Sequence, residues 1–122
     1  MENNELYEIA RNKAKSYSTN KKTRIARVAV ALLANNKKIY TGISVETSYS
    51  LGICAEYNAI ANMLQDKESK ILKIIAVNDE GKIYSPCGRC REYIYQINYD
   101  NMDTEVILEN KTLKIKELLP EI

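Results

Sequence analysis

Apolar residues recur along the chain with two different spacings, and these spacings predict its helices and strands. Over residues 5–16 they return about once per helical turn, as in an amphipathic helix that covers a core. Residues 27–34 are nearly all valine, alanine and leucine, and residues 38–46 follow after a polar turn, which indicates a β-hairpin. Because side chains alternate along a strand, we expect Ser44 and Glu46 on the same face of its second strand.

The second half of the chain predicts further helices and strands in alternation. A helix is expected from residue 54 to about 65, and another begins at Pro86, because the first helical residue needs no N–H. A short helix is expected around 115–119. Extended segments are expected at 71–77, 82–84 and 104–108. This order predicts an α/β fold in which helices cover both faces of a sheet, within a single domain over residues 1–122.

The charge of the chain is small overall but unevenly distributed. A net charge of +2 does not indicate nucleic acid or an anionic membrane as a partner. Basic residues are nevertheless concentrated before the first strand, where a solvated helix face and loop is the expected structure. These residues are Arg11, Lys13, Lys15, Lys21, Lys22, Arg24 and Arg27.

Neither a membrane span nor a signal peptide is expected. The longest wholly apolar run, residues 28–34, is far shorter than a membrane span, and the N-terminal residues are charged. Cysteines that stay reduced, as those of a metal-binding or catalytic site do, are typical of cytoplasmic proteins. The cytoplasm is therefore the expected compartment.

All three cysteines of the chain, Cys54, Cys87 and Cys90, fall near the starts of two predicted helices, and the chain has no histidine. The helix dipole and the free backbone N–H groups stabilise thiolates at such positions. Three sulfur ligands form an incomplete tetrahedral set for Zn²⁺, and catalytic zinc sites leave the fourth position to water, whereas structural sites fill it with protein. Glu56 follows Cys54 by two residues and can carry protons to and from that water. The sequence therefore predicts a catalytic zinc site.

Each of these residues also has a simpler explanation. Cysteines are often buried structural thiols, and Cys87 with Cys90 is a possible redox pair, although a redox pair explains neither Cys54 nor Glu56. A glutamate in the first turn of a helix is favoured by the dipole whatever its chemistry. Arg91 either adds positive charge beside the thiolates or is an ordinary surface arginine. The alternative to an enzyme is a non-catalytic binding module that zinc stabilises. Such a module does not require a proton-transferring residue such as Glu56.

The segments Cys54-Ala55-Glu56 and Pro86-Cys87-Gly88-Arg89-Cys90-Arg91, with the closing Glu117-Leu118-Leu119-Pro120, resemble the small cytidine deaminases. The resemblance implies a three-layer α/β/α sandwich with a mixed, roughly five-stranded sheet, a homotetramer, and hydrolysis of cytidine or deoxycytidine to the uracil nucleoside and ammonia. It also implies Zn²⁺ on the three cysteines and Glu56 as the proton shuttle. The substrate contacts that it implies are Ser44, Glu46 and Ala55.

The chain departs from this family at three points. Ser44 stands where the family has an asparagine that binds the sugar, and Tyr57 stands where an arginine commonly follows the Cys-Ala-Glu motif. The chain also has no phenylalanine to stack on the pyrimidine, and the candidate replacements are Tyr17, Tyr40 and Tyr49.

These departures leave a second substrate class open. Blasticidin S deaminases share both cysteine motifs and also lack the arginine, so a related aminopyrimidine nucleoside is an alternative substrate. A polynucleotide is disfavoured, because polynucleotide deaminases more often have histidine as the first ligand and this chain has no strongly basic surface.

Overall fold

A computed structural model describes residues 1–119, and its helices and strands follow the predicted alternation closely. The elements in chain order are α1 (Asn3–Lys13), β1 (Arg24–Ala34), β2 (Ile39–Glu46), the 3₁₀ turn η1 (Ser48–Ser50), α2 (Ala55–Gln65), β3 (Ile71–Asn78), β4 (Ile83–Tyr84), α3 (Gly88–Ile97), η2 (Tyr99–Asp103), β5 (Glu105–Ile107), β6 (Thr112–Lys114) and η3 (Ile115–Glu117). None of the helices in this part of the chain has the length and apolarity needed to cross a membrane.

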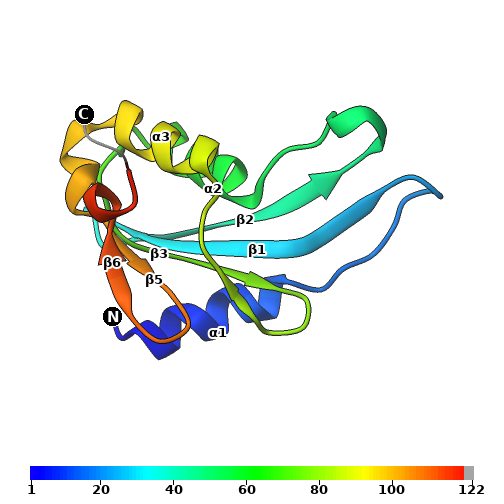
Figure 1. The fold of residues 1–122 in the computed structure, drawn as a ribbon, viewed down its shortest axis with the longest axis horizontal. Helices are drawn as coiled ribbons and strands as arrows, with labels where there is room; N and C mark the ends of the chain where they lie inside the picture. The colour runs from blue at the N-terminus through cyan, green and yellow to red at the C-terminus, as the bar shows by residue number, and fades with distance from the viewer. Residues whose placement is uncertain (120–122) are drawn as a thin grey trace.

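The strands form one mixed sheet between two layers of helices. Its continuous order is β2-β1-β3-β5-β6, and β4 pairs with the end of β3. The pairing of β3 with β5 is parallel, whereas the other pairs are antiparallel. Helix α1 lies on one face of the sheet, and α2 and α3 lie on the other (Figure 1). The predicted three-layer α/β/α sandwich with a mixed sheet is therefore confirmed.

The central strand β1 is buried on both faces, which explains its continuous apolar sequence. Val30 and Leu32 face the core under α2 and α3, while Ala31 faces the core under α1. Each of these side chains is fully buried. Helix α1 contributes Leu6 and Ala10 to the second core, as its amphipathic pattern predicts.

Helix α2 is attached to the edge strand β2 by side-chain hydrogen bonds to the strand backbone. Asn58 Oδ1 accepts a hydrogen bond from Ile43 N at 2.8 Å, and Asn62 Nδ2 donates one to Thr41 O at 2.9 Å. The polar stripe of this helix therefore satisfies backbone groups that an edge strand would otherwise leave unpaired. Gly42 lies between these contacts and allows the helix to approach the strand directly.

Two predictions about local structure are wrong. Helix α3 begins at Gly88, with Cys87 as its N-cap, so Pro86 precedes the helix and is not its first residue. The expected helix at 115–119 is a single turn, η3, after a strand β6 that sequence reasoning missed. Strand β6 exists because it pairs with β5, through Val106 and Leu113 among others, and no local pattern reveals such a partner. Pro120 of the closing motif lies outside the described residues.

We expect Gly42→Ala to lower the free energy of unfolding by about 1–3 kcal/mol. A Cβ atom at this position would lie 2.5 Å from Ala55 O and would press on the backbone of α2 at Ala59, so the helix has to move. Urea denaturation measures the change. Gly88→Ala is the matched control, because no atom lies within 4 Å of its added Cβ. Equal effects of the two variants would contradict this account of helix placement.

Candidate metal centre and adjoining cavity

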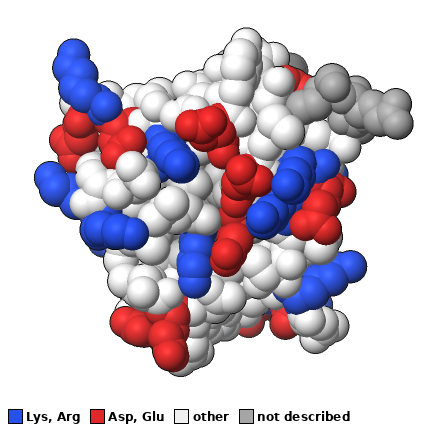
Figure 2. All heavy atoms as spheres, turned by 90° about the vertical axis from the view of Figure 1, so that its left-hand side faces the viewer, with Lys and Arg blue, Asp and Glu red and all other residues white. Residues whose placement is uncertain are grey.

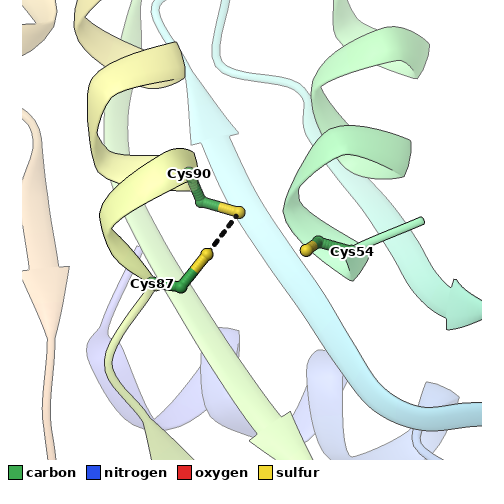
Figure 3. Close-up of side chains that lie close together, drawn as sticks. All are labelled: Cys54, Cys87 and Cys90. Atoms are coloured by element: carbon green, nitrogen blue, oxygen red, sulfur yellow. Dashed lines mark hydrogen bonds between the residues drawn. The ribbon is translucent and has the colours of Figure 1, made fainter. Parts of the chain in front are cut away.

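The three cysteines, which are far apart in the sequence, converge where α2 and α3 begin. Cys54 caps α2, Cys87 caps α3, and Cys90 lies in the first turn of α3. Their side chains point toward one another (Figure 3). The three sulfur atoms lie within 4.8 Å of one another, with 3.5 Å between Cys87 Sγ and Cys90 Sγ, and no disulfide joins them.

This donor set fits a tetrahedral zinc ion. With Zn–S bonds of about 2.3 Å, two sulfur ligands of such an ion are separated by about 3.8 Å. The observed spacing lies close to this value, and only three protein ligands converge in the described part of the chain. The predicted metal cluster is therefore formed by the fold.

The thiols differ in how readily they ionise. Burial raises the pKa of Cys54 and of Cys90, and the negative charge of Glu56 raises that of Cys90 further. Burial also raises the pKa of Cys87, but hydrogen bonds from the N–H groups of Cys90 and Arg89 and from the Cys90 thiol outweigh it, so the net shift is downward. Three neighbouring thiolates repel one another, and a divalent cation among them removes this repulsion.

Glu56 lies in the first turn of α2 beside the cysteines and has only 7% of its surface exposed. Burial raises the pKa of its carboxyl group, and hydrogen bonds from its own backbone N–H and from Cys90 only partly offset this shift. A carboxyl group with a raised pKa is better suited to accept and return a proton near neutral pH than an ordinary surface glutamate.

A cavity of about 480 Å³ opens beside this cluster, and Cys54, Glu56 and Cys87 line it. The predicted substrate contacts Ser44, Glu46 and Ala55 line it too. Among the predicted site residues, Cys90 and Arg91 do not line the cavity.

Ser44 and Glu46 point to the same side of β2, as the alternation predicts. Ser44 Oγ accepts a hydrogen bond from Val28 N at 3.0 Å and leaves its own proton available. Glu46 Oε1 accepts one from Arg27 Nε at 2.8 Å, and this contact raises the pKa of Arg27. The sequence places Arg27 only among solvated basic residues and does not predict its pairing with Glu46. Arg27 lies where the register of β1 with β2 shifts, between Ile25 and Ala29.

Arg91 makes its hydrogen bonds to the polypeptide around the second cysteine motif. Its guanidinium donates to Pro86 O at 2.7 Å, to Ser85 Oγ at 2.9 Å and to Leu118 O at 3.1 Å. These bonds attach the segment before Cys87 to the C-terminal part of the fold.

Aromatic residues connect the two helices that carry the cysteines. Tyr57 of α2 stacks on Tyr93 of α3, with ring centroids 4.1 Å apart and planes inclined by 12°. The guanidinium of Arg89 lies over the Tyr57 ring, with its Cζ 4.4 Å from the ring centroid, and Arg89 also lines the cavity. Sequence reasoning missed this cation, because the pairing of Arg89 with Tyr57 depends on how α2 and α3 pack.

The expected stacking residues do not line the cavity. Tyr40 is buried and donates to Asp66 Oδ2 at 2.6 Å, while Tyr17 and Tyr49 are exposed. Tyr84 of β4, which sequence reasoning did not single out, is the tyrosine that lines the cavity, and its hydroxyl accepts a hydrogen bond from Asn78 Nδ2 at 3.2 Å.

Comparisons with known proteins agree in sequence and in structure. Residues 1–105 match the family model described as the cytidine and deoxycytidylate deaminase zinc-binding region. The chain is 35% identical over 99 residues to a cytidine deaminase of Mycoplasma pneumoniae, covering 79% of this chain and 73% of that protein.

Solved structures have the same fold. A cytidine deaminase from Mycobacterium leprae superimposes with a TM-score of 0.81 at 25% identity, covering 97% of both chains. One from Burkholderia pseudomallei superimposes with a TM-score of 0.78 at 26% identity, covering 99% of this chain and 98% of that one.

We expect protein purified without chelator to contain about one Zn²⁺ per chain, because a single three-sulfur cluster forms. Cys54→Ser and Cys87→Ser should each remove most of this zinc and lower the melting temperature, since metal binding and folding are coupled. Elemental analysis and thermal melts with and without chelator measure both effects. A zinc-free wild-type protein, or a disulfide between Cys87 and Cys90 in reducing buffer, would contradict the assignment.

Proposed function

The chain belongs to the cytidine and deoxycytidylate deaminase family, and on this basis we propose that it hydrolyses a free cytosine nucleoside to the uracil nucleoside and ammonia. The observation that carries the proposal is that Cys54 and Cys87 of the three-cysteine cluster open, together with the buried Glu56, into one cavity. Its volume of about 480 Å³ lies in the range of small-molecule sites.

Cys54, Cys87 and Cys90 hold the zinc ion in this proposal. When bound there, zinc lowers the pKa of a water molecule, which supplies the nucleophile at neutral pH. Cys54 and Cys87 lie at the N-termini of α2 and α3, where the helix dipoles reduce the effect of the negative charge of the cluster, and the N–H groups of Arg89 and Cys90 in α3 bond to the Cys87 sulfur. Three reduced thiols in one site also favour the cytoplasm as the compartment.

Glu56 moves the protons of the reaction. Its carboxylate accepts a proton from the attacking water and donates it to N3 of the pyrimidine, and it then assists protonation of the departing amine. One C–O bond forms and one C–N bond breaks at the ring carbon, so that water is consumed and ammonia is released. Because burial raises its pKa, this carboxyl group exchanges protons at a smaller free-energy cost near neutral pH.

Ser44, Glu46 and Ala55 contact the substrate. Arg27 Nε donates a hydrogen bond to Oε1 of Glu46 and so fixes the orientation of the carboxylate. Its second oxygen, Oε2, can then accept a hydrogen bond from a sugar hydroxyl. The free proton of Ser44 can donate to the same sugar. Arg91 acts by positioning the segment that carries Cys87, since its hydrogen bonds go to Pro86 and to Ser85.

We expect Glu56→Gln to keep the fold and the zinc but to lose turnover by several orders of magnitude, because no histidine is present to take over the proton transfers. Ultraviolet difference spectra with cytidine, deoxycytidine and blasticidin S measure the loss. Glu92→Gln is the matched control, since Glu92 of α3 lies outside the cavity and bonds to Gln96. Activity of Glu56→Gln within about tenfold of the wild type would remove Glu56 from the mechanism.

The assembly that we propose is a homotetramer, as the resemblance to the small cytidine deaminases implies. Around the mouth of the cavity, the segment after β2 exposes large apolar side chains that a second copy of the chain can cover. The exposed fraction is 93% for Tyr49, 79% for Leu51 and 40% for Ile53.

We expect light scattering at micromolar concentration to give the mass of four chains. Tyr49→Ser combined with Leu51→Ser should shift the mass toward smaller species, because apolar surface at the interface is lost. Tyr99→Ser is the control, as Tyr99 is 68% exposed on η2. A monomeric wild-type protein would refute the tetramer.

A further inference from the structure

Within residues 1–119, Tyr84 is the only aromatic residue that lines the substrate cavity. It ends the short strand β4 and precedes Cys87, which lines the same cavity, by three residues. Because Tyr84 is 43% exposed, part of its aromatic surface is left uncovered by the core and is available to a ligand.

Tyr84 belongs to a row of side chains that crosses the sheet. It pairs with Ala76 of β3, and Val28 of β1 pairs with Asn78, two residues further along β3. Ser44 of β2 continues the row, since its Oγ bonds to Val28 N. Paired side chains, and residues two apart on a strand, share one face of a sheet, and Ala76 belongs to the core under α2 and α3. Tyr84 therefore lies on the face that carries the two cysteine-bearing helices.

The hydroxyl group of Tyr84 is held by a buried amide. Asn78 is only 5% exposed, and its Oδ1 accepts hydrogen bonds from Lys82 N at 2.8 Å and from Glu80 N at 3.0 Å. These bonds fix the amide, whose Nδ2 donates to the Tyr84 hydroxyl at 3.2 Å. A ring that is anchored in this way loses little conformational freedom when a ligand packs on it.

We propose that Tyr84 is a specificity residue, on whose ring the pyrimidine of the substrate stacks. The inference rests on the proposed deaminase function and adds a substrate contact to it. Glu46 of β2 and Tyr84 of β4 line the cavity from strands that β1 and β3 separate. A nucleoside whose sugar bonds to Glu46 therefore extends its base toward Tyr84. Cys87 follows Tyr84 closely in the chain, so the base meets the ring beside the metal cluster.

Stacking differs from an ordinary apolar contact in the ligand that it selects. Contacts between two π-systems need a planar aromatic ring on both sides. Uridine, the product of cytidine deamination, has such a ring. 5,6-Dihydrouridine has the same polar groups on a puckered, saturated ring. A tyrosine wall therefore favours uridine, whereas an aliphatic wall discriminates little between the two.

The kinetics of Tyr84→Leu and Tyr84→Phe with cytidine test the contact. We expect Tyr84→Leu to raise KM by about tenfold or more and to change kcat much less, because stacking stabilises the bound ground state and transition state alike. Tyr84→Phe keeps the ring and should hold KM within about threefold of the wild type. An unchanged KM in Tyr84→Leu, or equal impairment of both variants, would overturn the inference.

Tyr99→Leu is the matched control, because it also removes a stacked ring. Tyr99 of η2 lies outside the cavity, is 68% exposed and stacks on Tyr95 with ring centroids 4.9 Å apart. The η2 turn lies at the left of Figure 1, on the side that Figure 2 shows, where basic and acidic side chains intermingle. This substitution should leave KM for cytidine unchanged.

Fluorescence separates the inference from the deaminase function. The chain contains no tryptophan, so Tyr84→Trp introduces a single fluorophore at the cavity wall. In protein that also carries Glu56→Gln, uridine should quench this fluorescence and bind about tenfold more tightly than 5,6-dihydrouridine. Tyr99→Trp in the same background is the control and should show no quenching.

The possible outcomes differ for the two hypotheses. Quenching by uridine, without turnover of any cytosine nucleoside by the wild type, would support the stacking contact and refute the deaminase function. Turnover of cytidine by the wild type, with no quenching in the Tyr84→Trp protein or with equal affinity for the two ligands, would overturn the role of Tyr84 and leave the deaminase function standing.

Discussion

The direct approach of α2 to the edge strand β2 is the contact on which the rest of the site depends. Gly42 has no side chain to separate the helix from the strand, and Asn58 and Asn62 bond to the strand backbone on either side of it. This contact sets the height of the first turn of α2 above the sheet. It therefore places Cys54 and Glu56 within reach of the α3 cysteines, which the Tyr57–Tyr93 stack holds from the other side.

The electrostatics of the site follow from this packing. The N-termini of α2 and α3 meet at the cysteines, and N–H groups of α3 bond to the Cys87 sulfur. Burial, by contrast, disfavours the charged forms of Cys54, Cys90 and Glu56. Burial of so many acidic groups is tolerable where a divalent cation binds among them. Arg89 adds a further positive charge at the cavity, over the ring of Tyr57.

The strand β2 connects the cavity beside the metal cluster to a second, neighbouring concavity. Its alternation directs Ser44 and Glu46 to the same side, and Glu46 lines both the cavity and the second concavity. Of the seven basic residues that cluster in the sequence around the start of β1, four line this second concavity, namely Lys21, Lys22, Arg24 and Arg27. Their arrangement beside Glu46 comes from the irregularity in β1 and from the hydrogen-bonded turn before it. A cluster that looks like ordinary solvated surface in the sequence is thus concentrated at one place by the fold.

Local patterns in the sequence determine most of the elements and the chemical groups of the site. The cysteine motifs, Glu56 and the shared face of Ser44 and Glu46 follow from spacing, because periodicity and helix ends are properties of neighbouring residues. Contacts between distant segments are decided by the tertiary structure alone. Four features depend on a partner that is distant in the sequence and is brought close by packing. They are the strand β6, the hydrogen bond of Arg91 to Leu118, the pairing of Arg27 with Glu46 and the stacking of Arg89 on Tyr57. No local pattern encodes these partners, since each depends on how whole helices and strands dock.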